Sequence, residues 1–303
     1  MAKRNPALFY LWAHGGGRNY NPMDELDTPI LRSLVERSEV VFLEFVSWDL
    51  KSTAELERDW NTHIKTGDMP SKLRACISPS NPLEDYLFLA ELMSKGRKKL
   101  ILEKYPRADF NFVGEDQETH NVFYESSLER AIQEKEKFLW KAQPYQIERE
   151  KMVTETISTI PNTALVIFGA GHPELPQKVS LRRPTEVHYP YTGYPKSYAY
   201  ETQMSMQFRI TGKVNPELFC KSQMQNMSRN CISDGEKRYT SRQLDLLAHH
   251  YATIMTPEQI IGFKNYFISS STLLVGICAS DIFDSYLRKE NLPPVEEIVK
   301  LIQ

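Results

Sequence analysis

Short apolar runs, each about the length of one buried strand, recur between residues 7 and 169. They are ALFYLWA (7–13), EVVFLEF (39–45), ADFNFVG (108–114) and ALVIFG (164–169). A continuous apolar run of this length is typical of a strand that is covered on both faces. We therefore predict four buried strands in this part of the chain.

The segments between these runs have the spacing of amphipathic helices. In TPILRSLVERS (28–38), Thr28 can cap a helix and Pro29 suits its first turn. The apolar positions of this segment share one helix face, namely Ile30, Leu31, Leu34 and Val35. Two charged segments, 125–143 and 145–159, predict two further helices. Strands that alternate with helices indicate an α/β fold with a mostly parallel central sheet flanked by helices.

Breaks in this alternation of strands and helices indicate how the rest of the chain is organised. We expect residues 1–303 to form a single α/β domain. Residues 50–107 are rich in helical patterns and contain the turn signal SPSNP, which predicts a helical cap inserted between the second and third strands. The region 190–303 begins in the aromatic stretch YPYTGYPKSYAYETQ (189–203) and then predicts mainly helical segments.

Polar side chains stand at or just beyond the end of every predicted strand. In chain order they are His14, Glu44, Glu115 and His172. Ligands of open α/β sheets bind in the crevice outside the carboxyl ends of the strands, so we expect these side chains to converge on one rim. Imidazole and carboxylate groups are ligands of zinc, manganese and iron, and they also serve as acids and bases. The pattern predicts a metal or acid/base site, although a single such histidine is more often structural and Glu115 can equally cap the next helix.

Arg149 joins this set by a geometric argument. A helix that leads into a parallel strand runs antiparallel to it, so the start of the helix lies at the carboxyl rim of the sheet. Arg149 is in the first turns of the helix that precedes the 164–169 strand. We expect it to bind a carboxylate or to stabilise an oxyanion at this rim, the alternative being a solvated surface charge.

Two segments resemble a known superfamily. QIEREKMVTETISTIPNTALVIFGAGHPELPQKV (146–179) resembles the part of TraB-like proteins in which a Glu-Arg pair and a methionine precede a strand and a Gly-x-Gly-His turn. AHGGGRNYNPMDELDTPILRSLVERSEVVFLEF (13–45) resembles the first motif of the wider superfamily of erythromycin-esterase-like, ChaN-like, TraB and TIKI proteins, in which a histidine precedes a helix and a strand that ends in glutamate. Together the matches cover about residues 7–50 and 109–180.

The resemblance implies an α/β domain whose site uses two histidines in Gly-x-x-His motifs and a pair of glutamates. On this chain the histidines and the first glutamate correspond to His14, His172 and Glu44. Arg149 matches the arginine of the Glu-Arg motif, and Glu115 is the best-placed second glutamate.

The function expected on these grounds is that of a hydrolase acting on a peptide, amide or ester bond. His14, Glu44 and His172 would bind a divalent metal such as manganese, zinc or cobalt, or would orient a water molecule directly. Glu115 would act as the general base, and Arg149 would stabilise the developing oxyanion.

Two alternatives remain open. The first is a binding protein for haem or iron, as the ChaN-like resemblance implies, with the aromatic residues of 189–200 lining its pocket. The second is a non-catalytic scaffold of the same fold. Leu11 stands three residues before His14, where the motif has glycine and erythromycin esterases have glutamate, which favours the scaffold and argues against a macrolide esterase.

Composition narrows the choice of partners. The formal charge of −2 provides no global field for nucleic acid, so we expect a small-molecule or peptide substrate. No apolar stretch approaches the roughly 20 residues of a membrane span. The run 7–13 ends in a histidine and three glycines, where a signal peptide would have its cleavage site, so we expect a cytoplasmic protein. The four cysteines form no CxxC pair, which disfavours a zinc ribbon or a thioredoxin-like motif.

Overall fold

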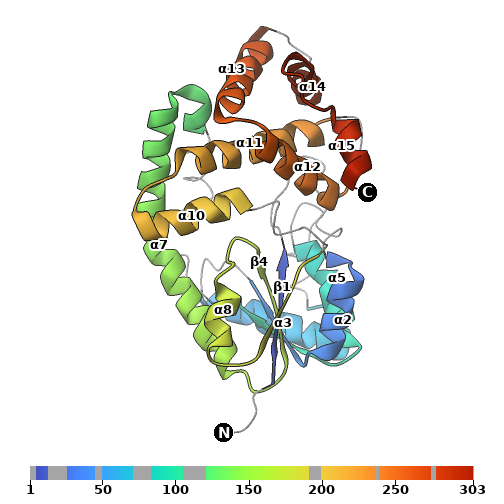
Figure 1. Cartoon of the computed structure of the whole chain (residues 1–303). Coiled ribbons are helices and arrows are strands. Elements are labelled where there is room, and N and C mark those ends of the chain that lie inside the picture. The colour runs from blue at the N-terminus through green and yellow to red at the C-terminus, as the bar shows by residue number, and fades with distance from the viewer. Residues whose placement is uncertain are drawn as a thin grey trace. The chain divides into compact units, whose positions relative to one another are not determined.

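The computed structural model has an α/β fold, which confirms the fold class predicted from the sequence. A five-stranded parallel sheet is flanked by helices, and the C-terminal region is helical (Figure 1). The structure describes residues 5–12, 26–44, 50–70, 83–104, 121–190, 199–235, 239–273 and 278–302.

Contacts divide the chain into two compact units, where the sequence led us to expect one domain. The α/β unit consists of Met1–His14, Pro22–Phe110 and Gln146–Pro190, and the helical unit consists of Gly15–Asn21, Asn111–Tyr145 and Tyr191–Gln303. The boundary falls within α7 (Leu128–Thr159), next to Pro144. Two helices were predicted on either side of this proline, but α7 is one helix that contains it.

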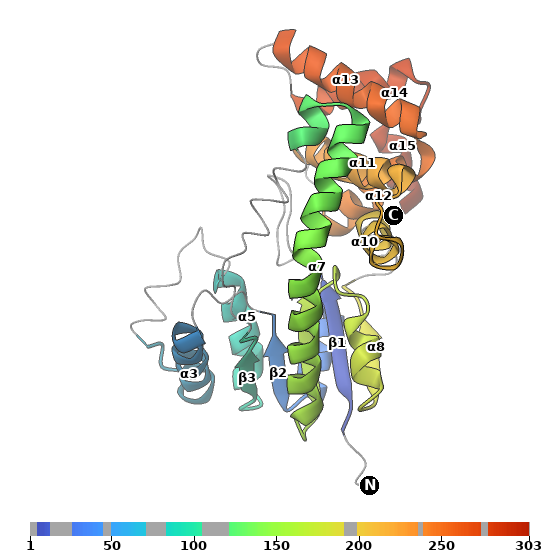
Figure 2. The ribbon, with the colours of Figure 1, turned by 90° about the vertical axis from the view of Figure 1, so that its left-hand side faces the viewer.

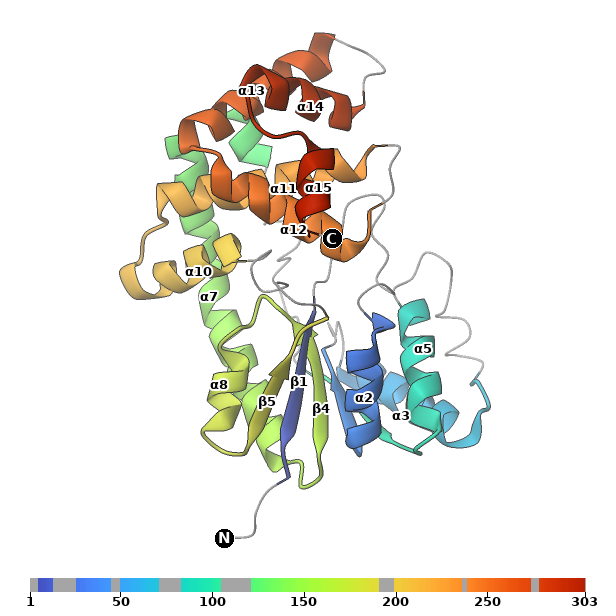
Figure 3. The same cartoon turned by 45° about the vertical axis from the view of Figure 1, so that its right-hand side comes forward.

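The sheet has the strand order β3-β2-β4-β1-β5, and every pair is parallel. Its strands are β1 (Ala7–Trp12), β2 (Val40–Leu43), β3 (Lys99–Leu102), β4 (Ala164–Gly169) and β5 (Thr185–His188). The central strands β1 and β4 are buried at every residue, as their continuous apolar runs predict (Figure 3).

Three of the predicted strands correspond to β1, β2 and β4. The fourth prediction, at 108–114, lies outside the described residues. β3 instead lies inside the range 50–107 that we predicted to be a helical cap. Because β3 is a four-residue edge strand with an exposed Lys99 and a half-buried Ile101, it lacks the continuous apolar run of a central strand.

Helices cover both faces of the sheet. On one face α2 (Pro29–Arg37), α3 (Leu50–Thr66) and α5 (Leu83–Ser94) pack on the side chains of Leu8, Tyr10 and Trp12. On the other face the second part of α7 and α8 (Leu175–Ser180) pack on Ala7, Phe9 and Leu11 (Figure 3). The alternation along β1 therefore serves two separate cores.

The described helices of residues 50–107 form a layer on one face of the sheet rather than the predicted cap. Trp60 and Ile64 of α3, and Leu89 and Met93 of α5, are buried in the core on that face of the sheet. The physical reason is that β2 and β3 are parallel neighbours, so the chain between them must cross over the sheet and does so with these helices.

Helix α3 lies beside β3 at the outer edge of the sheet (Figure 2). Its side chains close this edge. Asn61 Nδ2 donates to Leu100 O at 2.8 Å, and Leu100 N donates to Asn61 Oδ1 at 2.9 Å, as a neighbouring strand would. Glu57 Oε2 accepts from Leu102 N at 2.8 Å. These contacts satisfy backbone groups that an open sheet edge would expose.

The helical unit is built around α11 (Pro216–Ser233), whose inner face is buried along most of its length. Around it are the first part of α7 and the helices α10 (Ala199–Thr211), α12 (Ser241–Ile254), α13 (Pro257–Leu273), α14 (Ala279–Lys289) and α15 (Val295–Ile302). No helix in the described part of the chain combines the length and the apolar character that a membrane crossing requires.

Arg183 ties together the amino ends of the strands. Its side chain is buried, and its guanidinium donates to the backbone carbonyls of Asn5, Pro6, Ile157, Ile160 and Asn162 at 2.5 to 3.0 Å. The planar fork thus joins the start of β1, the end of α7 and the loop before β4.

We expect Arg183→Lys to lower the free energy of unfolding by about 2–4 kcal/mol, because an ammonium cannot reach all of these carbonyls and leaves buried acceptors without donors. Urea denaturation followed by circular dichroism measures the change. The exposed neighbour Arg182→Lys is the control and should stay within about 0.5 kcal/mol. Equal stability of the two variants would contradict this role of Arg183.

Candidate functional site

Charged side chains gather in the α/β unit at the carboxyl ends of three adjacent strands. Glu44 directly follows β2, and Glu103 directly follows β3. His172 comes three residues after β4, and Arg149 lies on α7, which leads into β4. We call the following six residues the Arg149 cluster: Glu44, Glu103, Arg149, Glu150, His172 and Lys178.

The two strand-end glutamates are positioned by the hydrogen bonds of the sheet itself. Glu44 N donates to Ile167 O at 2.9 Å, and Glu103 N donates to Leu43 O at 3.0 Å. Glu44 Oε2 also accepts from Gly169 N at 2.5 Å. The parallel register therefore fixes the backbones of both glutamates, and the contact with Gly169 N orients the carboxylate of Glu44.

Arg149 is the centre of the cluster. Its Nε and Nη2 donate to the two carboxylate oxygens of Glu103 at 2.6 and 2.7 Å, which is a bidentate pair. Nη2 also donates to Glu44 Oε1 at 2.6 Å, and Nη1 contacts His172 Nε2 at 3.2 Å. A guanidinium has five N–H donors. Among the described residues the fifth, on Nη1, has no partner.

The charge of Arg149 is secured by its neighbours. Burial by itself would lower the pKa of the guanidinium, but the hydrogen bond to Glu103 and the charges of Glu44 and Glu103 outweigh it, and the net effect is a raised pKa. The guanidinium carbon also lies 5.1 Å from the ring centroid of Phe168. The side chain is still 19% exposed, so a ligand can reach it.

His172 is held by the turn that follows β4. Its backbone N donates to Gly169 O at 3.1 Å, and its carbonyl accepts from Leu175 N at 3.2 Å. Nδ1 lies 3.1 Å from Glu150 Oε1. Because a carboxylate can only accept and the N–H of Arg149 can only donate, Nδ1 carries the proton and Nε2 carries the lone pair.

Glu150 and Lys178 extend the cluster behind His172. The Glu150 side chain is 1% exposed, and its second oxygen, Oε2, accepts from Lys178 Nζ. Lys178 Nζ also lies 3.2 Å from Glu174 Oε2, one helical turn away on α8. A continuous series of charged contacts therefore runs from Lys178 through Glu150 and His172 to Arg149.

The structure brings together three of the residues that the sequence indicated, Glu44, Arg149 and His172. Nε2 of His172 is 3.9 Å from Glu44 Oε1. Arg149 lies at the rim, in partly buried contacts rather than as a solvated surface charge. His14 and Glu115 lie outside the described residues.

Sequence reasoning missed Glu103, Glu150 and Lys178. Glu103 had a usable signal, because the run KLIL followed by glutamate repeats the pattern of VVFLEF at Glu44, but we had assigned its range to the cap. Glu150 and Lys178 had none, since each acts through a contact between elements that the sequence does not reveal.

The structure describes two of the three residues that the sequence suggested for a metal site, Glu44 and His172, and both contact Arg149. Arg149 already donates hydrogen bonds to Glu44 Oε1 and to His172 Nε2, the two atoms that would face the ion. A divalent cation bound there would displace these N–H groups and lie beside a fixed positive charge. No group of three or more His, Cys, Asp or Glu side chains in the described part of the chain is arranged to hold a metal.

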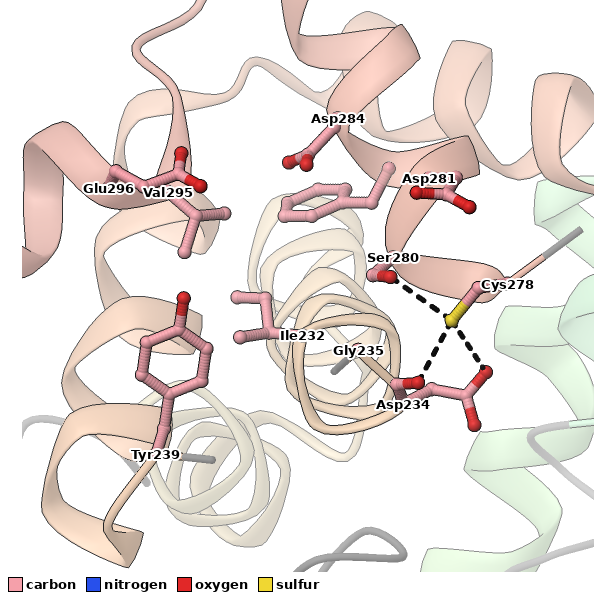
Figure 4. A pocket seen from close by; sticks show the side chains of 11 residues that line it. Ile232, Asp234, Gly235, Tyr239, Cys278, Ser280, Asp281, Asp284, Val295 and Glu296 are labelled. Atoms are coloured by element: carbon pink, nitrogen blue, oxygen red, sulfur yellow. Dashed lines mark hydrogen bonds between the residues drawn. The ribbon is translucent and has the colours of Figure 1, made fainter. Parts of the chain in front are cut away.

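A separate pocket of about 380 Å³ lies in the helical unit (Figure 4). Its polar lining is mostly acidic, from Asp234, Asp281, Asp284 and Glu296. Cys278 Sγ donates to Asp234 O at 2.9 Å, and Ala279 N donates to Asp234 Oδ2 at 3.2 Å, so this carboxylate caps the start of α14. No motif of the sequence indicates this pocket, because three separated segments form it.

We expect Arg149→Met to lower the free energy of unfolding by about 3–5 kcal/mol, because the buried charge of Glu103 would lose its bidentate contact with the guanidinium. Adding Glu103→Gln should make the double variant less destabilised than the sum of the two single changes. Chemical denaturation of the four proteins of this cycle measures the coupling, with the exposed Lys151→Met on the same helix as the control. Additive losses would show that the two side chains do not interact.

Comparison of this chain with protein-family models, curated proteins and solved structures finds no match. The geometry of the Arg149 cluster and the motifs in the sequence are therefore the two guides to the function of this chain.

Proposed function

We propose that the chain is a hydrolase that cleaves an ester, amide or peptide bond at the Arg149 cluster. One observation carries the proposal: the imidazole of His172 stands between a buried carboxylate, Glu150, and a fixed cation, Arg149, at the carboxyl rim of the sheet. A carboxylate–imidazole pair beside a positive donor is a combination that acyl-transfer chemistry requires.

His172 is the proposed general base. Its Nε2 takes the proton of an attacking water molecule, and the imidazolium that forms is stabilised by the negative charge of Glu150 at Nδ1. The 3.2 Å contact between Nε2 and Arg149 Nη1 opens to admit the water and the substrate carbonyl. His172 then returns the proton to the leaving group.

Arg149 is the proposed oxyanion donor. Its Nη1 faces the atom that activates the water, and one N–H of this nitrogen has no partner among the described residues. Glu103 and Glu44 hold the rest of the guanidinium, so once the contact with His172 has opened, the donor is already oriented when negative charge develops on the substrate.

The substrate in this proposal is a small molecule or a peptide, met in the cytoplasm, with an uncharged carbonyl group. The resemblance of 146–179 to TraB-like proteins favours an amide or peptide over an ester. Arg149 contacts Glu44 Oε1 and His172 Nε2, the two atoms expected to bind an ion. We therefore propose the metal-free form of the reaction, in which His172 and Arg149 act directly on water and substrate.

No contact in the described part of the chain favours the two alternatives. The aromatic stretch 189–200, on which haem binding would depend, lies mostly outside the described residues, with Tyr189, Pro190 and Tyr200 described. A scaffold would need no carboxylate–imidazole–guanidinium arrangement at the rim of the sheet.

The test is a hydrolysis screen of the full chain against ester, amide and peptide libraries, with and without a chelator. We expect turnover that survives the chelator, that falls about 10²–10⁴-fold in His172→Gln, and that falls about 10²–10³-fold in Arg149→Lys. His188→Gln, on the edge strand β5, is the matched control and should keep full activity. Turnover that needs added manganese, zinc or cobalt would overturn the metal-free form, and no turnover together with a Soret band on adding haem would support the binding protein.

A further inference from the structure

We propose that Glu150 and Lys178 are positioning residues that together hold His172 as the tautomer with its proton on Nδ1. This inference rests on the proposed function, because it explains how Nε2 keeps the lone pair that the reaction needs. Neither residue was indicated by the motifs of the sequence, and neither lies at the end of a strand.

The Glu150 carboxylate contacts Nδ1 of the His172 ring. Its carboxylate is almost completely buried, and a buried carboxylate persists only with partners for its charge. Oε1 is 3.1 Å from Nδ1 of His172, and Oε2 accepts from Lys178 Nζ. Each carboxylate oxygen of Glu150 therefore has its own partner, and a single orientation of the carboxylate makes both contacts.

Lys178 fixes that orientation from α8. This helix begins at Leu175, directly after the turn that carries His172, so ammonium and imidazole belong to one short segment. Lys178 is 36% exposed and has a second carboxylate partner, Glu174, at 3.2 Å. Its contact with Glu150 therefore restrains the Glu150 carboxylate. The ammonium of Lys178 itself lies at the edge of the cluster, where water also reaches it.

The charge of Lys178 has a consequence when Glu150 becomes an amide. An ammonium can only donate, so in Glu150→Gln it would take the amide oxygen as its acceptor. The amide NH₂ would then face Nδ1 of His172, and Nδ1 would have to accept. The proton would move to Nε2, and the contact between Nε2 and Arg149 Nη1 would be lost, because both atoms would then be donors. This is the wrong tautomer for a base at Nε2.

Removing the ammonium as well reverses this effect. In Glu150→Gln combined with Lys178→Met, the Lys178 ammonium no longer donates to the amide oxygen. The amide can then turn so that its oxygen accepts from Nδ1 of His172. The original tautomer returns, although the carboxylate charge is absent. If Glu150 only supported the local packing, the additional loss of the Lys178 ammonium would not restore the original tautomer of His172.

The experiment is ¹H–¹⁵N spectroscopy of the full chain labelled on its histidine rings, at about pH 8, above the ordinary pKa of histidine. The His172 signals are assigned by their loss in His172→Gln. We expect a protonated Nδ1 and a bare Nε2 in the unaltered protein, the reverse in Glu150→Gln, and the original pattern in the double variant. In the same series kcat should fall about 10- to 100-fold in Glu150→Gln and recover in part in the double variant.

Two further variants keep the inference testable if Glu150→Gln does not fold. Lys178→Met should move the Nδ1 proton resonance downfield, because Glu150 without its cation is a stronger acceptor, and Lys178→Arg should leave it in place. Glu174→Gln is the control, since Glu174 contacts Lys178 at the start of α8, and it should change nothing.

The outcomes separate this inference from the proposed function. An unchanged tautomer in Glu150→Gln, or no recovery in the double variant, overturns the role of Glu150 and Lys178 even where hydrolysis is found. The expected tautomers without hydrolysis of any substrate overturn the proposed function and leave the positioning of His172 standing.

Discussion

The bidentate ion pair between Arg149 and Glu103 is the interaction on which the Arg149 cluster depends. Glu103 is almost wholly buried at the end of an edge strand, where an unpaired carboxylate would be costly, and Arg149 supplies both of its oxygens with donors. With its guanidinium plane fixed in this way, Arg149 has one orientation left for Glu44 and His172. The pair therefore determines where the contacts of Arg149 with Glu44 and His172 lie.

The sheet and α7 provide the frame for this pair. Parallel ladder bonds set the backbones of Glu44 and Glu103 side by side, and α7 brings Arg149 and Glu150 as consecutive residues. Consecutive residues on a helix point in different directions, so Arg149 reaches the glutamates of the strands while Glu150 reaches His172 and Lys178 from behind. In the proposed hydrolytic site, the donor and the base are therefore held by separate carboxylates.

Arginines organise both ends of the sheet, but by different chemistry. At the amino ends Arg183 binds backbone carbonyls, which are neutral, so that its contacts stabilise the fold without creating a charged group for a ligand. At the carboxyl ends Arg149 binds carboxylates and keeps partial exposure and one N–H without a partner among the described residues. The same side chain thus has a structural use at one end and a proposed catalytic use at the other.

The sequence by itself determined the central strands and part of the rim. Continuous apolar runs identified β1, β2 and β4, because a strand covered on both faces leaves no room for polar residues, and the antiparallel course of α7 placed Arg149 beside Glu44 and His172. Only the tertiary structure decided that Lys99–Leu102 is a strand, that Glu103 is the partner of Arg149, and that Glu150 and Lys178 lie behind His172. The physical reason is that an edge strand has a weak local pattern, while the pairing of charges depends on which elements pack together, and that choice is made by the whole core.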